Sequence, residues 1–206
     1  MSLDFVHDIQ AVYRETIDAM ARPGSLHSIQ EQAEKVEIAC GCLKATVLLA
    51  LMLLDTEVRF KVVSEQEAEL TKILNQLTYA KATAAEAAQF ILITVDAEAA
   101  EVEQALQAAY VGSLLNPHHS ATVIFEVKGL STEPTTDGAG EQGLILSGPG
   151  IQRESFICVR TPLNWIELRA QKNKEYPLGI DFIFVDPDHR MFALPRTTKI
   201  QKQEIR

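Results

Sequence analysis

The sequence contains few cysteines and no long apolar run. Three cysteines among 206 residues are an odd number, which excludes complete disulfide pairing and is typical of a protein from a reducing compartment. The longest apolar run, residues 45–54, is roughly half as long as a membrane-spanning helix. Residues 1–10 carry acidic groups at helical spacing, unlike a signal peptide. We therefore expect a cytoplasmic protein without a membrane partner.

Basic residues are also in the minority. The chain has 28 acidic and 19 basic residues and a formal net charge of −9. This charge opposes non-specific binding to nucleic acid and to anionic membranes, so we expect neither as a partner. It still allows one local basic pocket. The 47% of hydrophobic residues is enough to build a sizeable core.

Several motifs that would define an enzyme class are missing. The sequence has no Gly-x-Ser-x-Gly elbow, no His-Glu-x-x-His pair and no P-loop. Cys40 and Cys42 are separated by one residue, and on a helix their side chains would point about 200° apart, which suits one metal ion poorly. We expect buried core thiols and no metal. The alternative is a zinc site that adds Cys158, or His118 and His119.

Helical and strand patterns alternate along the chain. The expected helices cover 5–20, 36–54, a segment that starts at a Ser64–Glu67 capping box, 96–110, and a segment that starts at Thr161-Pro162. The expected strands and extended segments are 25–29, 57–63, 90–95, 121–127, 144–147, 153–159, 180–185 and 191–194. Residues 129–143 predict a mobile loop, and 198–206 a frayed tail. This order indicates a single α/β domain, residues 1–206, with a central mixed sheet flanked by helices.

Residues 176–198 are the most informative stretch. Two apolar runs, 180–185 and 191–194, surround a polar turn and predict a buried β-hairpin. Asp181 lies inside the first run, where a carboxylate is unfavourable unless a partner neutralises it. Arg196 follows the second run and is the nearest obvious cation. We expect the two side chains to form a structural pair.

The glycine-rich segment 146–151 is a candidate anion loop. Glycine lets neighbouring backbone amides converge on a phosphate, which makes Ser147, Gly148 and Gly150 candidate ligand-binding residues. Pro149 removes one amide from this segment, so a tight turn is the simpler interpretation.

Four arginines are candidate phosphate-binding residues. Arg14, Arg22, Arg160 and Arg196 could converge as bidentate forks, and ordinary salt bridges to the excess of carboxylates are the alternative. Arg196 is the best candidate of the four, because it follows a buried strand and precedes the hydroxyl of Thr197.

Six segments together resemble a known family of phosphonate metabolism proteins, the H component of bacterial carbon–phosphorus lyase. These segments are ARPG at 21–24, LLD at 53–55, Gly112-Ser113 with Pro117, LSGPGI at 146–151, PLGID at 177–181 and PRTT at 195–198. The resemblance covers nearly the whole chain, and PLGID followed by PRTT is its most specific part. The histidine after Pro117 is a departure, because the family has an acidic residue there.

The resemblance implies an α/β fold similar to the large domain of pyridoxal-phosphate transferases, without the cofactor. It implies a homodimer within a core assembly that contains the G, I and J subunits of carbon–phosphorus lyase. That assembly transfers a phosphonate to the ribose of ATP, releases adenine and forms ribose 1-phosphonate 5-triphosphate. A radical enzyme later breaks the carbon–phosphorus bond.

The family gives this chain no catalytic residue, so we expect an accessory, non-catalytic subunit. The alternatives are a stand-alone phosphate- or nucleotide-binding enzyme and a zinc-binding module.

Overall fold

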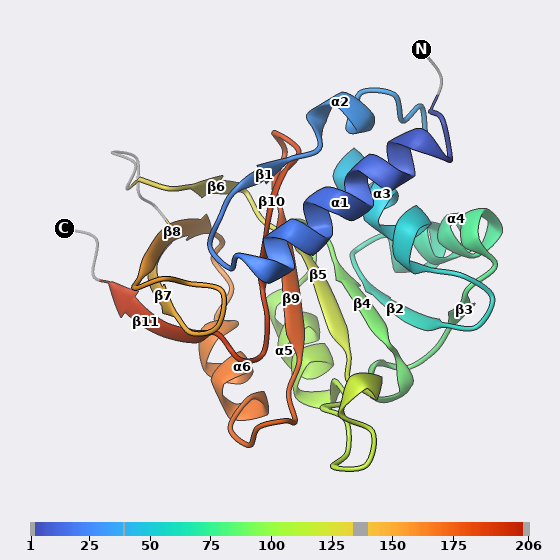
Figure 1. Ribbon diagram of the computed structural model, residues 1–206. Helices are drawn as coiled ribbons and strands as arrows, with labels where there is room; N and C mark the ends of the chain where they lie inside the picture. Colours follow the sequence, from blue (N-terminus) through green and yellow to red (C-terminus); the bar gives the residue numbers. More distant parts are fainter. Residues whose placement is uncertain (1–2, 39, 134–139, 204–206) are drawn as a thin grey trace.

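A seven-stranded mixed sheet forms the centre of the protein (Figure 1). The computed structural model describes residues 3–38, 40–133 and 140–203. The strand order is β1-β10-β9-β5-β4-β2-β3, in which β1 and β10 run antiparallel to their neighbours and the other pairs are parallel. The strands are β1 (His27–Ser28), β2 (Arg59–Val63), β3 (Lys81–Ala82), β4 (Phe90–Ile93), β5 (Thr122–Glu126), β9 (Asp181–Val185) and β10 (Arg190–Leu194). The predicted α/β class, the mixed sheet and the β9–β10 hairpin are confirmed.

Helices cover both faces of this sheet (Figure 1). The helices are α1 (His7–Ala21), α2 (Gln30–Ala33), α3 (Lys44–Leu53), α4 (Glu67–Thr78), α5 (Ala99–Ala108) and α6 (Ile166–Lys172), with short 3-10 turns at Ala85–Ala87 and Pro117–His119. Residues of α1 to α4 share one apolar cluster with one face of the strands, and α5 and α6 share a second cluster with the other face. Successive strand residues alternate between the clusters, as the two-residue period of a strand requires. In the part of the chain that is described, no helix combines the length and apolarity needed to cross a bilayer.

A second, antiparallel sheet packs beside the first and was not expected as a unit. Its order is β11-β7-β8-β6, with β6 (Gly129–Ser131), β7 (Glu141–Ser147), β8 (Ser155–Arg160) and β11 (Lys199–Gln203). The predicted loop at 129–143 is therefore wrong at both ends, because β6 and β7 pair with β8. The predicted frayed tail is wrong for 198–203, because β11 pairs with β7 and Thr198 is buried. Residues 134–139 and 204–206 of these two predictions lie outside the described residues.

The predicted helix at 36–54 is much shorter in the structure. Only Lys44–Leu53 is helical, and Gly41 in the preceding turn adopts a positive φ of 73°, which favours glycine. The backbone N–H of Leu43 donates to Oε1 of Glu126 at 2.7 Å, so a side chain from β5 holds the start of α3. Local sequence gives no sign of this distant cap.

Two other expected helix starts differ. Ser64 Oγ accepts a hydrogen bond from the Gln66 N–H, whereas the Glu67 carboxylate pairs with Lys61, so the reciprocal capping box does not form. The Thr161 hydroxyl accepts a hydrogen bond from the Leu163 N–H in a turn, and α6 begins only at Ile166.

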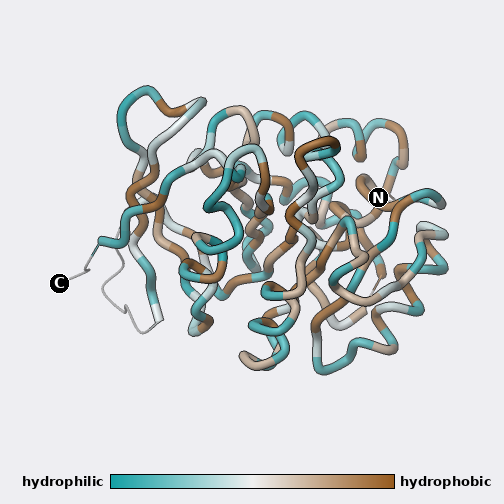
Figure 2. Tube along the Cα trace, turned by 90° about the horizontal axis from the view of Figure 1, so that it is seen from below, coloured by the Kyte–Doolittle hydropathy of each residue, from teal (hydrophilic) through white to brown (hydrophobic). Residues whose placement is uncertain are grey.

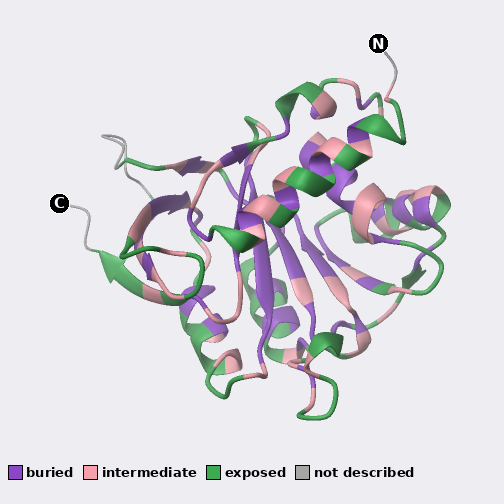
Figure 3. Cartoon of the chain, in the orientation of Figure 1, coloured by how far each residue is buried: buried purple, intermediate pink, exposed green. Residues whose placement is uncertain are grey.

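Aromatic packing fixes the position of α6. Trp165, which directly precedes this helix, is fully buried against Phe182 and Phe184 of β9, with ring centroids 5.6 and 4.7 Å away. Phe184 stacks on Phe192 of β10 with centroids 4.8 Å apart. Figure 3 shows the central strands as mostly buried and the exposed residues on outer turns and outer helix faces, and Figure 2 shows the hydropathy along the same chain. This packing places the side chains of α6 over the ends of β10 and β11.

Candidate functional site

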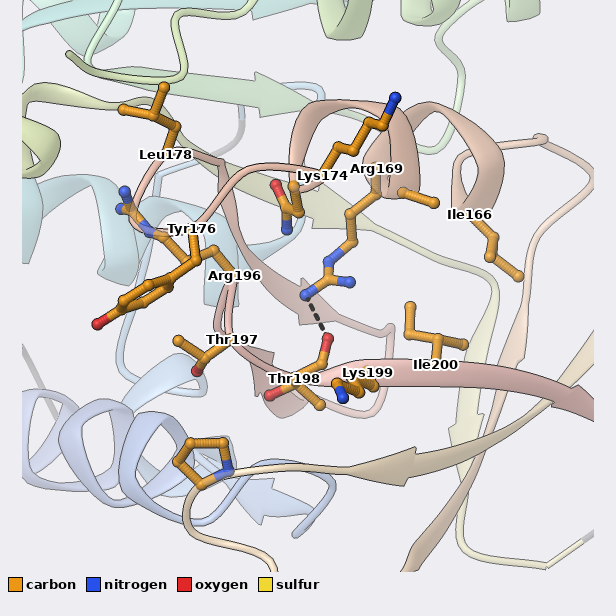
Figure 4. A pocket seen from close by; sticks show the side chains of 13 residues that line it. Ile166, Arg169, Lys174, Tyr176, Leu178, Arg196, Thr197, Thr198, Lys199 and Ile200 are labelled. Carbon is orange, nitrogen blue, oxygen red and sulfur yellow. Dashed lines mark hydrogen bonds between the residues drawn. The ribbon is translucent and has the colours of Figure 1, made fainter. Parts of the chain in front are cut away.

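The candidate site is a pocket between α6 and the segment that joins β10 to β11 (Figure 4). We call it the basic pocket; it has a volume of about 750 Å³. Its described lining is Pro149, Ile166, Arg169, Ala170, Asn173, Lys174, Tyr176, Leu178, Arg196, Thr197, Thr198, Lys199 and Ile200. This lining holds four cationic side chains and no carboxylate. Four cationic side chains of this acidic protein therefore lie together in the basic pocket.

Arg169 is the most unusual residue of the basic pocket. Its side chain is buried, with the residue only 3% exposed, and it reaches from α6 towards the backbone before β11 (Figure 4). Nη2 donates to the carbonyl oxygens of Pro195 and Thr198 at 2.6 and 3.1 Å. Nε is buried and has no hydrogen-bond partner among the described residues. The negative charge of Asp181 acts on the guanidinium without a direct contact and favours its charged form. Burial lowers the pKa of Arg169 to about 10, so it remains charged at neutral pH.

Thr198 contributes a second unsatisfied group to the same pocket. The residue is 2% exposed, and its Oγ1 is buried without a hydrogen-bond partner in the described part of the chain. Its backbone N–H donates to the Pro195 carbonyl at 2.9 Å, which forms a turn between β10 and β11. Buried polar groups are normally hydrogen-bonded, so these two groups, which lie behind the pocket surface, are exceptions.

Arg196 lies in the pocket wall but is engaged by the protein itself. Its Nε and Nη2 contact the Asp181 carboxylate, and its backbone N–H donates to Oδ1 of the same residue at 2.6 Å. Nη1 donates to the carbonyl of Pro117 at 2.9 Å, and Nη2 also donates to the Ser120 hydroxyl. The two residues form the buried ion pair that the sequence suggested, and Arg196 keeps little capacity for a ligand.

Three of the six segments that carried the family resemblance meet at this arginine. Arg196 of PRTT binds Asp181 of PLGID, the carbonyl of Pro117 and, at 3.4 Å, the carbonyl of Pro177. Three segments that are far apart in the sequence therefore form one hydrogen-bonded unit beside the basic pocket.

The glycine-rich segment forms a turn. The Ile151 N–H donates to the Gly148 carbonyl at 3.1 Å, and Ser147 pairs with Lys199 at the end of β7. A Cβ at Gly150 would lie 2.2 Å from the carbonyl oxygen of Ala21, so this position accepts only glycine. Of this segment only Pro149 lines the basic pocket.

The structure therefore brings together part of the predicted ligand set. Arg196 and Thr197 line the basic pocket, whereas Ser147, Gly148 and Gly150 form the neighbouring turn.

The four candidate arginines do not converge. Arg14 is exposed on α1, Arg22 pairs with Asp18, and Arg160 lies on β8. The arginine that joins Arg196 is Arg169, which the sequence patterns did not single out. The sequence feature that could have indicated Arg169 is its spacing of three residues from Ile166, which places both residues on the inward face of α6.

The cysteines are arranged differently from the expectation. Cys40 and Cys42 lie in a turn rather than on a helix, and their Sγ atoms are 3.2 Å apart instead of pointing in opposite directions. A hydrogen bond from Cys42 lowers the pKa of Cys40 to about 7, and the same bond together with burial raises the pKa of Cys42. Burial raises the pKa of Cys158, on β8, to about 12.

The zinc alternative gains no support from the described residues. They contain no group of three histidine, cysteine or acidic side chains that could hold a metal ion. His118 and His119 are exposed in the 3-10 turn after Asn116, with ring centroids 4.3 Å apart.

Comparison with known proteins identifies the family. Residues 2–201 match the family described as bacterial phosphonate metabolism protein (PhnH). The chain is 31% identical over 193 residues to a protein named as C-P lyase subunit protein HtxG of Stutzerimonas stutzeri, covering 93% of this chain and 85% of that protein. It is 25% identical over 201 residues to the alpha-D-ribose 1-methylphosphonate 5-triphosphate synthase subunit PhnH of Rhizobium meliloti, covering 97% and 94%. The protein belongs to the bacterial phosphonate metabolism (PhnH) family, as the sequence segments indicated.

Proposed function

We propose that this protein is an accessory, non-catalytic subunit of a carbon–phosphorus lyase core complex in organic phosphonate catabolism. In this role it supports the transfer of an alkylphosphonate to the ribose of ATP, with release of adenine. The observation that carries the proposal is the family match over residues 2–201, together with two relatives that are both named as subunits.

The geometry of the basic pocket supports a binding role rather than a chemical one. Its described polar lining consists of cationic, amide, phenol and hydroxyl groups, without a carboxylate, histidine or cysteine. Such a set can hold an anion but offers no paired acid and base for general catalysis. A role in an assembly also fits the exposed apolar side chains of Phe5, Tyr13 and Ile17, at and just before α1, because such surfaces often contact other proteins.

The proposal includes a homodimer in the cytoplasm and contacts with the G, I and J subunits of the complex. Co-purification from a cell that expresses the native partners tests the assembly, and the mass of the isolated protein in solution tests the dimer. We expect the isolated protein to leave ATP and a phosphonate unchanged. Turnover of both by the purified protein alone would exclude an accessory role.

We further infer that the fold is related to the large domain of pyridoxal-phosphate transferases and has lost the cofactor. The parallel strands β2, β4, β5 and β9, covered by helices on both faces, support this relation. Addition of pyridoxal phosphate is expected to give no absorbance band of a lysine Schiff base. Appearance of that band at stoichiometric cofactor contradicts the inference.

The second candidate function is a stand-alone phosphate- or nucleotide-binding enzyme. The concentration of cationic side chains in the basic pocket favours it. The turnover assay on the isolated protein separates the two candidates, because only a stand-alone enzyme consumes ATP without the other subunits.

A further inference from the structure

We propose that Cys40 and Cys42 are a modification site, at which a small peroxide converts the two thiols into a reversible disulfide bond. The two residues lie in the turn before α3 and do not line the basic pocket. The inference goes beyond the role as a subunit and does not depend on it, because it concerns a reaction of the isolated chain.

The distance between the two sulfur atoms is the first argument. The Sγ atoms of Cys40 and Cys42 are 3.2 Å apart in the reduced protein. A disulfide bond is roughly 2 Å long, so the two sulfurs need to approach each other by only about 1 Å. The bond therefore requires no rearrangement of distant parts of the fold.

Gly41 supports this arrangement from the backbone. Its φ of 73° lies in the left-handed region that favours glycine, and it shapes the turn in which the two thiols meet. Leu43 follows Cys42 directly, and its N–H donates to Oε1 of Glu126 at 2.7 Å. The disulfide would thus form next to the hydrogen bond that holds the start of α3.

The protonation of the pair is the second argument. The hydrogen bond from Cys42 lowers the pKa of Cys40 to about 7, so much of Cys40 is thiolate at neutral pH. The negative charge of Glu126 acts on both thiols and that of Asp96 acts on Cys42, and both oppose a thiolate. At Cys40 the hydrogen bond outweighs this opposition. Thiolates, rather than thiols, react with peroxides.

The burial of the pair favours a small oxidant. Cys40 is 5% exposed, and Cys42 is half-buried. Hydrogen peroxide is little larger than water, whereas a disulfide such as oxidised glutathione has to bring a bulky chain against a largely covered sulfur. We therefore assign the oxidant to the class of small hydroperoxides.

The reaction consists of two balanced steps. The Cys40 thiolate attacks one oxygen of hydrogen peroxide, the O–O bond breaks, and hydroxide leaves, which gives a sulfenic acid at Cys40. The Cys42 sulfur then attacks the Cys40 sulfur, the S–O bond breaks, and water leaves with the proton of Cys42. In total, two thiols and one peroxide give one disulfide and two water molecules, and two electrons pass from sulfur to the peroxide.

Peptide mapping of the purified full chain tests the proposal. The protein is treated with hydrogen peroxide at neutral pH, alkylated after unfolding and digested with trypsin. Residues 36–44 form one tryptic peptide with both cysteines, and Cys158 lies in another. We expect the first peptide to lose two hydrogen atoms and both alkylation sites, and to recover them with dithiothreitol.

The rate and its pH dependence give a second readout. Burial raises the pKa of Cys158 to about 12, so we expect the pair to react at least about a hundredfold faster than Cys158 at neutral pH. The rate is expected to rise with pH, to reach half its maximum at about pH 7 and to level off above it. Cys158→Ser is the matched control and is expected to keep both the rate and the midpoint.

One variant separates the two steps. Cys42→Ser keeps the sulfur that is oxidised and lacks the thiol that closes the bond. We expect a sulfenic acid at Cys40 in this variant, which dimedone traps, and no disulfide. In the wild-type protein, the second step is expected to consume the sulfenic acid before dimedone reaches it.

Three free thiols after a peroxide treatment that oxidises the same chain in guanidinium would overturn the proposal. A bond from Cys40 or Cys42 to Cys158, or to a second chain on a non-reducing gel, would overturn it as well. These results come from the wild-type protein, so they do not depend on the folding of a variant. None of them bears on co-purification with other subunits, and this proposal and the proposed function therefore fail independently.

Discussion

At the scale of single residues, one carboxylate–guanidinium pair organises the region around the site. Asp181 and Arg196 are both largely buried, and their remaining hydrogen-bonding groups are satisfied by the backbone of Arg196 and by Pro117 and Ser120. A buried ion pair of this kind stabilises the fold mainly because neither charge is left buried without a partner. The pair thus gives Asp181 of PLGID and Arg196 of PRTT a structural role at the two ends of the hairpin.

Replacement of Arg196 tests this structural role. Arg196→Ala leaves Asp181 buried without its counter-charge, and we expect a loss of about 3–5 kcal/mol in the free energy of unfolding. Urea denaturation measures it. The control is Arg22→Ala, which removes an exposed pair with Asp18 and is expected to change stability by less than about 1 kcal/mol. A stable Arg196→Ala protein with lost assembly would instead assign Arg196 a functional role.

The thiol of Cys40 gives a second test at this scale. Its pKa of about 7 depends on the hydrogen bond from Cys42, so Cys40 is a thiol below that pH and a thiolate above it. Cys42→Ala removes the donor and is expected to move the pKa back towards the ordinary value of roughly 8.5. Ultraviolet thiolate absorbance during a pH titration measures the change, with Cys158→Ser as control. An unchanged midpoint in Cys42→Ala would show that another group sets this pKa.

At the scale of elements, α3 depends on a residue from the sheet. Glu126 is buried at the end of β5, and its Oε1 accepts hydrogen bonds from the Leu43 N–H and the Thr46 hydroxyl at 2.7 and 2.6 Å. Its Oε2 accepts from the Val95 N–H at 3.2 Å. The Glu126 carboxylate therefore replaces the missing local cap of α3 and connects this helix to the residues that follow β4.

The Glu126→Gln variant tests this cap. The amide nitrogen of glutamine would face the Val95 N–H, which places two hydrogen-bond donors opposite each other. We therefore expect the unfolding free energy to fall by about 1–3 kcal/mol at acidic pH. Burial raises the pKa of Glu126, so the stability that its protonated form contributes is complete below pH ~4.3 and is lost as pH rises through the folded-state pKa.

Glutamine does not titrate, so only the wild-type protein loses stability as pH rises from ~4.3 through the folded-state pKa of Glu126. The difference in unfolding free energy between wild type and Glu126→Gln is therefore expected to narrow over this pH range. Denaturation of both proteins across the acidic range measures it. A difference that widens with pH would show that the three hydrogen bonds outweigh burial in setting the pKa.

At the scale of the whole molecule, the central sheet could be predicted, whereas only β7 and β8 of the second sheet could. The strands β4, β5 and β9 are continuous apolar runs buried on both faces, a pattern that local sequence shows directly. By contrast β6 is short and β11 is largely polar, and they become strands only because β8 and β7 supply partners. Pairing with distant segments leaves no local periodicity to detect.

The same reason explains which residues of the basic pocket the sequence could indicate. Arg196 and Thr197 were predicted from their place after a buried strand, and they line the basic pocket. Arg169 lies 29 positions before Thr198, whose carbonyl it binds, and only the fold brings the two together. A lone arginine on a short helix carries no sign that it will be buried.

The strand β11 completes both the second sheet and the basic pocket, which gives a prediction at this scale. A chain that ends at Thr198 loses Lys199 and Ile200 from the pocket and leaves the edge of β7 unpaired. Each lost ladder hydrogen bond contributes about 1 kcal/mol, so we expect a destabilisation of a few kcal/mol and self-association through the open edge. Calorimetric melting and size-exclusion chromatography measure the two effects. A chain that ends at Gln203 keeps β11 and is expected to match the full protein, whereas equal behaviour of all three chains would mean that residues 199–203 contribute nothing to the fold.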